Sequence, residues 1–359
     1  MHVVVATCAH RGDDARIVHR QARSLLEAGH QVTLVAPYAD GDPPGLVRVD
    51  VPRAVGRRRW RAWRATRQAL AARRGVADVL LVHDPELLAV VATLRWRAPI
   101  VWDVHEDFVA SVGDRRWIPR WARPAVVRLV LVVERVARRR VHLLLAEDAY
   151  AERLGAAAVV PNSTWVPTTV APLDEGRTPR VVYVGRISAS RGVRELVALG
   201  RRLRGRVDVV LIGDADADVR EQVGAAARAG DVTWLGYRTN PEAMAEVDGA
   251  LAGLSLLHDE ANYRHSRPTK LVEYLAHGVP VVTTPLPLAV ELVRESGGGA
   301  VVPFGDVEAT VDAVERLLGD RPGRDRAARA GHAHVLAHFS WQTDGARFVR
   351  LLEEWAAQA

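Results

Sequence analysis

A single lysine stands in a chain whose other basic residues are all arginine. Of 49 basic residues only Lys270 is lysine, and it lies in residues 267–280, which read RPTKLVEYLAHGVP. Lysine carries a compact charge on a flexible stem, whereas arginine carries a planar fork. Lys270 therefore marks a position where arginine does not fit, unless it is a chance survivor on a solvated helix face.

The residues around Lys270 have the pattern of a helix that begins beside an anion. Pro268 suits the first turn of a helix, because its missing N–H removes no hydrogen bond there. The free amides of that turn and the positive end of the helix dipole form an anion site, to which Lys270 adds a charge. Glu273 follows three residues later on the same face. The alternative is a Lys270–Glu273 surface pair worth under about 0.5 kcal/mol.

Polar residues also follow apolar runs in the first half of the chain. They are Gly12, Asp14 and Arg16 after the first run, His83–Asp84 after a second, and His105 beside Asp103 and Glu106 after a third. Ligands of doubly wound sheets bind at the carboxyl ends of strands, which is where such residues lie. Asp14 and Arg16 could instead pair with each other or cap a helix. A structural part is favoured for His83–Asp84.

Strand and helix patterns alternate in both halves of the chain. In the first half we predict a helix at 15–27 and strands at 3–6, 30–35, 79–83, 100–104 and 159–161. In the second half we predict strands at 181–184, 207–212, 232–235, 249–254, 279–283 and 300–302, with helices at 191–204, 219–229, 241–245, 268–277, 289–295 and 307–319. Continuous apolar runs are typical of strands covered on both faces. The alternation predicts an α/β protein with two parallel, doubly wound sheets.

Length and composition indicate two domains. A chain of 359 residues is long for one core, and residues 162–172 are rich in Thr and Pro, as linkers are. We place the domains at 1–165, joined by a C-terminal helix at about 343–357, and at 175–338. The net charge is +6, and the first 170 residues hold 26 arginines against 17 acidic residues. This asymmetry suggests lobes with different partners.

Several classes of protein are disfavoured. Cys8 is the only cysteine, which excludes an internal disulfide or cysteine metal cluster and fits a reducing cytosol. The N-terminus lacks the basic region of a signal peptide, and the apolar stretch 125–133 is too short to span a bilayer. The alternating acids of 214–218 could hold a cation, but they precede a predicted helix, where Asp serves as a cap. We therefore expect no metal.

The segment from Pro268, PTKLVEYLAHGVPVV, resembles the donor-site helix of family-4 retaining glycosyltransferases with the GT-B fold. The resemblance continues in order along nearly the whole chain, at residues 14–17, 83–84, 103–106, 160–162, 184–193, 211–214, 235–238 and 339–341. It implies two Rossmann-like domains that face a central cleft, the first for the acceptor and the second for the nucleotide sugar. It also implies transfer of a sugar from a nucleotide diphosphate, we expect UDP, to an acceptor hydroxyl with retention and without cofactor.

The resemblance assigns residues to the donor. They are Arg186, Arg191, Gly213, Tyr237, Arg238, Asn262, His265, Thr269, Lys270, Leu271 and Glu273. Arg186 and Arg191 would hold the pyrophosphate and stabilise the charge of the leaving group, and Arg191 replaces the family's usual Lys. Glu273 would bind the ribose hydroxyls. His265 replaces a family Glu near the donor sugar, where Asn262 and Tyr263 would also line the pocket.

The resemblance also places His105, Lys270 and Arg186 at the reacting centre. Its acceptor side would contain Gly12, Asp14, Arg16 and Glu106. Retention in this family is thought to need no enzymic nucleophile, because the leaving phosphate accepts the acceptor's proton. This fits a chain without paired carboxylates at glycosidase spacing. The acceptor would be a lipid-linked or cell-surface glycan precursor, or a secondary metabolite.

Other functions remain open. A sugar-nucleotide epimerase of the same fold would turn over the donor without an acceptor, and His265 keeps a decayed binding protein in view. A dinucleotide oxidoreductase is disfavoured, because Gly-x-Gly-x-x-Gly follows neither first strand. Arg/Trp clusters at 57–64 and 115–123 suit an anionic membrane surface, or else a solvated face with core tryptophans. Nucleic acid is disfavoured because no binding module accompanies the charge. We expect a cytoplasmic protein, peripheral at the inner membrane face.

Overall fold

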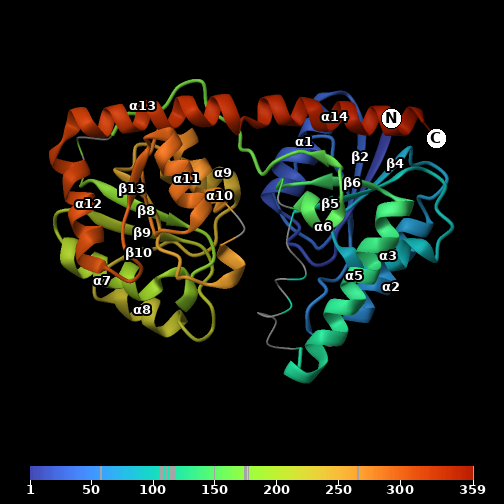
Figure 1. Ribbon diagram of the computed structural model, residues 1–359, viewed down its shortest axis with the longest axis horizontal. Helices are drawn as coiled ribbons and strands as arrows, with labels where there is room; N and C mark the ends of the chain where they lie inside the picture. The colour runs from blue at the N-terminus through green and yellow to red at the C-terminus, as the bar shows by residue number, and fades with distance from the viewer. Residues whose placement is uncertain are drawn as a thin grey trace. The chain divides into compact units, whose positions relative to one another are not determined.

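The computed structural model describes residues 1–56, 59–105, 109, 112, 118–148, 150–173, 176, 178–264 and 267–358. The chain divides into two compact units. Unit 1 is Met1–Asn162 with Trp341–Ala359, and unit 2 is Ser163–Ser340. Each unit is built on one parallel β-sheet with helices on both faces (Figure 1).

The sheet of unit 1 has seven strands in the order β3-β2-β1-β4-β5-β6-β7. All neighbouring strands are parallel. The direction in which strands are added reverses between β1 and β4, which is the topological switch point where ligands of such sheets bind. The strands are β1 (His2–Ala6), β2 (Gln31–Ala36), β3 (Val47–Asp50), β4 (Val79–Val82), β5 (Ile100–Val104), β6 (His142–Leu145) and β7 (Ala158–Val159).

Helices cover both faces of this sheet. One face packs against α2 (Arg59–Ala71), α3 (Pro85–Ala92), α5 (Arg123–Arg140) and α6 (Tyr150–Leu154). Toward the other face lie the π-helix η1 (Ala15–Ala22), α1 (Arg23–Glu27) and α14 (Trp341–Ala357). The C-terminal helix α14 buries Trp341, Phe348 and Leu352, and the indole of Trp341 donates to Ser24 Oγ at 2.9 Å. A short 3₁₀ helix, η3 (Arg120–Ala122), precedes α5.

The sheet of unit 2 has six parallel strands in the order β10-β9-β8-β11-β12-β13, with its switch point between β8 and β11. Neighbouring residues of β8 face different cores, because Val181 and Tyr183 belong to one cluster and Val182 to the other. The strands are β8 (Arg180–Val184), β9 (Asp208–Ile212), β10 (Thr233–Trp234), β11 (Ala252–Ser255), β12 (Val281–Thr283) and β13 (Gly299–Val301).

The helices of unit 2 also form two layers. One core includes α7 (Val193–Leu203), α8 (Arg220–Arg228) and α12 (Val307–Gly319). The other includes α9 (Asn240–Val247), α10 (Thr269–Ala276), α11 (Pro287–Ser296) and α13 (Arg321–His338). Two 3₁₀ helices, η4 (Ala189–Arg191) and η5 (Ala261–Tyr263), lie in the loops after β8 and β11.

The predicted fold class is confirmed, since both sheets are parallel and doubly wound. Some elements were not predicted. β3 is an edge strand without a buried apolar run, and α13 buries only Arg324, Gly331 and Val335. The predicted helix at 15–27 is a π-helix followed by a short α-helix. In the described part of the chain, every helix is too short or too polar to cross a bilayer.

Candidate functional site

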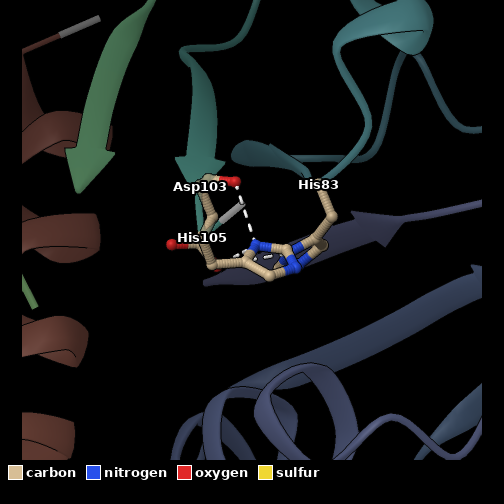
Figure 2. A group of neighbouring side chains, drawn as sticks. All are labelled: His83, Asp103 and His105. Carbon is tan, nitrogen blue, oxygen red and sulfur yellow. Dashed lines mark hydrogen bonds and ion pairs between the residues drawn. The ribbon is translucent and has the colours of Figure 1, made fainter. Parts of the chain in front are cut away.

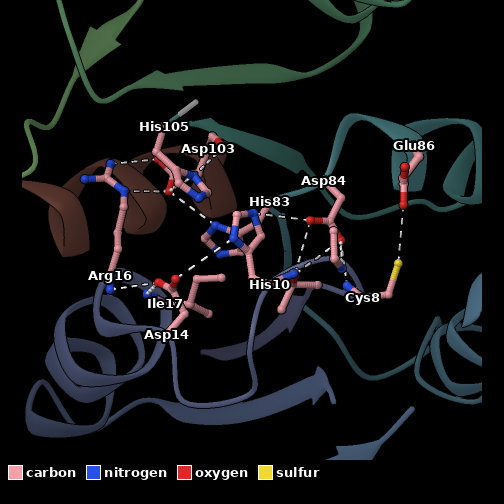
Figure 3. A network of polar contacts seen from close by, with 12 residues as sticks. Cys8, His10, Asp14, Arg16, Ile17, His83, Asp84, Glu86, Asp103 and His105 are labelled. Carbon is pink, nitrogen blue, oxygen red and sulfur yellow. Dashed lines mark hydrogen bonds and ion pairs between the residues drawn. The ribbon is translucent and has the colours of Figure 1, made fainter. Parts of the chain in front are cut away.

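Three histidines meet at the carboxyl end of the sheet in unit 1. His10 follows β1, His83 follows β4 and His105 follows β5, and these three strands are neighbours. The ring of His105 lies 4.7 Å from that of His10 and 5.5 Å from that of His83, measured between centroids. Figure 3 shows the polar contacts around them. These residues form the histidine cluster.

Asp103 is the shared partner of two members of this cluster, His83 and His105 (Figure 2). Its Oδ2 lies 3.3 Å from His83 Nδ1 and 3.4 Å from His105 Nδ1. Arg16 donates from Nε to Oδ2 and from Nη2 to Oδ1, both at 2.8 Å. Gln21 Nε2 donates to Oδ2 at 2.9 Å. The carboxylate is fully buried, so its charge depends on these partners.

The π-helix explains why Arg16 and Gln21 reach one carboxylate. Hydrogen bonds of a π-helix join residues five apart, so residues at that spacing lie nearly above one another. Arg16 also donates to the carbonyls of Val160 and Pro161 at 2.9 and 3.1 Å. Asp14 begins the helix, because its Oδ1 accepts from the amides of Arg16 and Ile17. Of the two alternatives for Asp14, the cap is correct, and the partner of Arg16 is Asp103.

The pKa values of Asp103, His105 and His83 are shifted in different directions. Burial alone would raise the pKa of Asp103, but the charge and hydrogen bonds of Arg16 hold that pKa well below its usual range. Burial alone would lower the pKa of His105, but its contacts with Asp103 outweigh burial, so this pKa is raised. For His83 burial wins, and its pKa is lowered. Of the two imidazoles beside Asp103, His105 is therefore the one that keeps its second proton to higher pH.

Asp84 organises the loop after β1. It accepts hydrogen bonds from the amides of Cys8 and Ala9 at 2.6 and 3.1 Å and from Thr7 Oγ1 at 3.2 Å. His10 Nε2 lies 3.4 Å from Asp84 Oδ1. Burial, and then the negative charges of Asp84 and Glu86, raise the pKa of the Cys8 thiol, which excludes an activated thiolate. Asp84 thus fixes the position of His10.

His83, Asp103 and His105 are also the candidate ligands for a metal ion. Ligand atoms of His83, Asp103 and His105 lie within 4.8 Å of one another. However, both oxygens of Asp103 already accept hydrogen bonds from Arg16. The guanidinium supplies the positive charge that a metal would bring, and a second cation on this carboxylate would be repelled. The arrangement suits orientation of His105 better than metal binding.

Lys270 in unit 2 has very different surroundings. Its Nζ lies 3.7 Å from the ring centroid of Tyr183, and among the described residues it has no hydrogen-bond partner. Its side chain is 7 % exposed. Burial, and next the charge of Arg191, lower its pKa well below the usual range, against a smaller opposing effect of Glu273. The interpretation of Lys270 as a solvated surface residue is therefore wrong.

Glu273 does not form the surface pair that was the alternative. It is also 7 % exposed, and it accepts a hydrogen bond from Asn240 Nδ2 at 3.2 Å. Asn240 begins α9, which follows the loop after β10. Glu273 is thus held toward that loop by a neutral amide.

Tyr274 positions α10 at the switch point. Its Oη accepts from the amide of Val184, the last residue of β8, at 2.7 Å. Its ring fills the space beside Gly253 on β11, where an added Cβ would lie 2.1 Å from the ring. These contacts fix α10 against both strands of the switch point, and Lys270, one turn earlier, reaches the end of β8. There Gly185 adopts φ +125°, and an added Cβ would lie 3.4 Å from Lys270 Nζ.

The two predicted phosphate arginines are not alike. Arg186 is largely exposed and donates from Nε and Nη2 to the two oxygens of Asp216, at 2.6 and 2.8 Å. Arg191 lies with its guanidinium 5.7 Å from the ring centroid of Tyr263. Burial raises the pKa of Tyr183 to about 12, against the opposing charge of Arg191. The acids of 214–218 do not cap α8 as expected, because its N-cap is Val219.

The remaining described donor residues lie in three places, after β9, after β10 and at the start of α10. Gly213 follows β9 with φ +142°, and an added Cβ would lie 2.1 Å from Gly185 O, so the two loops require this close approach. Arg238 is exposed and donates to Tyr237 O at 3.1 Å. At the start of α10, Thr269 is exposed and Leu271 is buried.

Some predicted residues cannot be placed, and others were missed. Outside the described residues lie Glu106, His265, Arg57, Arg58, residues 115–117 and the side chain of Asn262. Sequence reasoning missed His10, Gln21 and Asn240, and it considered Asp216 only as a cation ligand or helix cap, not as the partner of Arg186. His10 had a usable signal, because it follows the first strand. Gly12 is a packing residue, since an added Cβ would lie 1.9 Å from Pro37 O.

The chain is similar in sequence or in fold to several known proteins. The chain is 28 % identical over 182 residues to alpha-D-kanosaminyltransferase of Streptomyces kanamyceticus, covering 49 % of this chain and 46 % of that one. The match thus spans about half the length of that relative. Among solved structures, sucrose-phosphate synthase from Thermosynechococcus elongatus has TM-score 0.74 at 17 % identity, covering 100 % and 99 % of the two chains. HepE of Anabaena, in complex with UDP-glucose, has TM-score 0.71 at 14 % identity, covering 98 % and 99 %.

Two family models match the chain in succession. The one described as "Glycosyl transferase 4-like domain" matches residues 15–170, and the one described as "Glycosyl transferases group 1" matches residues 178–320. They follow one another in the order of the two sheets and together span most of the chain. The chain belongs to the family-4 glycosyltransferases of the GT-B fold.

Proposed function

We propose that this protein transfers a sugar from a UDP-sugar to an acceptor hydroxyl with retention of configuration. The observation that carries this proposal is Lys270, a buried amine without a hydrogen-bond partner among the described residues, at the switch point of unit 2. A buried charge of this kind needs an anionic partner, and a nucleoside diphosphate supplies one. The kanosaminyltransferase relative and the UDP-glucose complex of HepE support the same substrate class.

Unit 2 is the proposed donor side. Lys270 and Arg191 face the diphosphate, where fixed positive charge stabilises the charge that develops on the leaving group. Glu273 accepts from the ribose hydroxyls in place of Asn240. Arg186 contacts the phosphate when it leaves Asp216, and the loop of Tyr237 and Arg238 holds the base. Gly213, Thr269, Leu271, Asn262 and His265 complete this proposed set.

Unit 1 is the proposed acceptor side. His105, whose pKa is raised by its contacts with Asp103, donates a hydrogen bond to a sugar hydroxyl at the reacting centre. Asp103, Arg16 and His83 keep the imidazole in place. We assign Gly12, Asp14 and Glu106 to recognition of the acceptor. The acceptor is a glycan or glycolipid precursor or a secondary metabolite.

The reaction needs no enzymic nucleophile and no metal in this proposal. The acceptor oxygen bonds to the anomeric carbon while the bond to the diphosphate breaks, and the departing phosphate oxygen takes the acceptor's proton. The buried Cys8 thiol is unsuited to attack, and the Asp103 carboxylate is engaged by Arg16. Chelator should therefore leave turnover unchanged.

We place the protein in the cytoplasm, with unit 1 in contact with an anionic membrane surface. The exposed Trp60 and Trp121 and the basic first half of the chain support this contact. A lipid-linked acceptor would then be met at the inner face of the membrane.

Ligand-dependent melting tests the donor site. UDP should raise the melting temperature of the wild-type protein, and Lys270→Ala and Glu273→Ala should remove that increase. Arg329→Ala, an exposed position on α13, is the control that keeps it. If no nucleoside diphosphate changes the melting temperature, the donor-site assignment is wrong.

Turnover tests the reaction. Slow hydrolysis in a screen of UDP-, GDP- and TDP-sugars would identify the donor, and NMR of the glycosylated product would show the anomeric configuration. Interconversion of the donor sugar without any acceptor would instead indicate an epimerase.

A further inference from the structure

The helix α5 of unit 1 has an apolar face that no other described part of the protein covers. Leu129, Val132 and Val136 are each more than half exposed, and their spacing places them on one side of the helix. Trp121, in the 3₁₀ turn that leads into α5, is 85 % exposed. The opposite side of α5 packs against α3, β6 and α6 (Figure 1). The apolar face is thus additional to the side that the fold uses.

An arginine stripe runs beside this apolar face. Arg128, Arg135 and Arg139 are exposed, and their spacing of seven and four residues places them together along the helix. The only acidic residue of α5, Glu134, is 3 % exposed and lies 3.1 Å from Arg153 of α6. The exposed side of α5 therefore carries charge of one sign only.

This combination fits a lipid surface. A helix with an apolar stripe and a cationic flank lies in the interface of a bilayer, where acyl chains bury the stripe and anionic headgroups neutralise the arginines. With 18 residues, α5 would lie along roughly 27 Å of membrane. A second copy of this chain fits less well, because two such faces would bring their arginine stripes together.

The first Arg/Trp cluster of the sequence is used differently. Arg59 forms an ion pair with Glu86 at 2.6 Å, and the indole of Trp63 donates to the same carboxylate at 3.1 Å. These contacts lie inside unit 1. Of the two described tryptophans in that cluster, only Trp60 is well exposed. The stretch 125–133, considered from the sequence only as a membrane span, is the better membrane contact.

We propose that the exposed face of α5, with Trp121, docks unit 1 flat on the surface of an anionic lipid bilayer. This extends the membrane contact in the proposed function by naming the helix and the lipid charge that it recognises. Vesicle binding needs neither donor nor acceptor. The proposal can therefore fail while the transferase assignment holds, and the reverse is equally true.

Vesicle co-sedimentation of the full chain tests the proposal. The protein should pellet with phosphatidylcholine vesicles that contain about 30 mol % phosphatidylglycerol, remain in solution with pure phosphatidylcholine, and be released as salt rises. Arg128→Gln with Arg135→Gln should weaken binding about thirtyfold, from roughly 1 kcal/mol for each arginine near the surface. Leu129→Gln with Val132→Gln should abolish it.

Matched variants in unit 2 test whether vesicle binding depends on where the arginines and apolar side chains lie, and not only on how many the protein has. Arg326→Gln with Arg329→Gln removes the same charge from the exposed side of α13, and Leu336→Gln with Val290→Gln removes exposed apolar side chains. Both controls should bind vesicles like the wild type. All variants should keep the wild-type melting temperature and nucleotide response, because the changed residues are exposed.

Three outcomes would overturn the proposal. They are equal binding to neutral and anionic vesicles, unchanged binding of both α5 variants, and a concentration-dependent dimer in analytical ultracentrifugation that Leu129→Gln with Val132→Gln dissociates. The last outcome would identify a second copy of the chain as the occupant of this face.

Discussion

The histidine cluster of unit 1 and the lysine site of unit 2 lie at equivalent places in two similar sheets. They differ in how their buried ionisable groups are paired. Asp103 is buried with Arg16, Gln21 and two histidines around it. Lys270 is nearly as buried, but its Nζ has no hydrogen-bond partner among the described residues. Among the described residues, Asp103 has a directly bonded counter-charge, whereas Lys270 has only the ring of Tyr183 and the charge of Glu273 near it.

This difference indicates that the two sites have different roles. A buried charge with all its partners is stable and rigid, so it can hold a neighbouring group such as His105 in one orientation. A buried charge without a partner destabilises the free protein, and it gains most when a ligand of opposite charge arrives. We interpret unit 1 as the orienting half and unit 2 as the half that binds the charged substrate.

The largest effect should come from removing the partner of Asp103. Arg16→Ala should lower the stability of unit 1 by about 3–5 kcal/mol, because it leaves a buried carboxylate without its main counter-charge. Denaturant unfolding followed by tryptophan fluorescence would measure this. The loss should shrink as pH falls, because the unpaired Asp103 can then take up a proton.

Arg23→Ala is the matched control for that experiment. Arg23 pairs with Glu27 at 2.7 Å on the surface of the same helical segment, and both side chains are about half exposed. Its removal should cost under about 0.5 kcal/mol. Equal losses for the two variants would contradict the idea that Asp103 depends on Arg16.

Lys270→Met should stabilise the free protein, whereas Arg16→Ala should destabilise it. It should raise the stability of unit 2 by about 1–3 kcal/mol, because a buried unpaired charge is replaced by an apolar side chain. The pKa of Lys270 is lowered in the fold, so its penalty is largest at low pH and disappears as pH rises past the ordinary lysine range. The same variant should lose the increase in melting temperature with UDP. A destabilised Lys270→Met would show that the site is complete without an anion.

Lys270→Arg sharpens this prediction, because it keeps the charge. Gly185 lies beside Nζ, where an added Cβ would be in ordinary contact at 3.4 Å, and the planar guanidinium is wider than the compact ammonium. We expect weaker UDP binding by isothermal titration calorimetry and slower turnover. Unchanged affinity and turnover would mean that the lysine is a chance of composition.

Titration of the histidines tests the orienting half. NMR of the imidazole groups should show the pKa of His105 above, and that of His83 below, the ordinary histidine value. The stability that protonated His105 contributes should be present at low pH and lost as pH rises through its raised pKa. Asp103→Asn should bring the pKa of His105 down. A His105 that titrates like an exposed histidine would contradict the cluster.

The smallest effect should come from Arg186. Its partner Asp216 lies in an exposed ion pair, so Arg186→Gln should change the stability of the free protein by less than about 1 kcal/mol. UDP binding should weaken more than this, if Arg186 leaves Asp216 for the phosphate. Calorimetry of the variant and of Asp216→Asn would separate the two contributions, because Asp216→Asn should leave Arg186 free and bind UDP no more weakly than the wild type.

Local patterns were enough to predict most strands of both sheets and the segment around Lys270, although β6, which was not predicted, also has an apolar run. Buried parallel strands require apolar runs, and the turns between them require Gly or Pro, so both leave a visible trace in the sequence. The same patterns were insufficient for β3, α13 and the π-helix. β3 and α13 bury few apolar residues, and the side chains of the π-helix bond to Asp103, which lies some eighty residues away in the sequence.

The sequence by itself determined that Lys270 is exceptional and that His105 and Asp103 follow a strand. Only the tertiary structure decided that Lys270 is buried without a hydrogen-bond partner among the described residues, that Arg186 is paired, and that Arg16 belongs to Asp103. The physical reason is that a motif fixes the type and order of charges. The sheet brings distant strands together and so decides which partners each charged group has and how deeply it is buried. Partners and burial in turn set the pKa of each group.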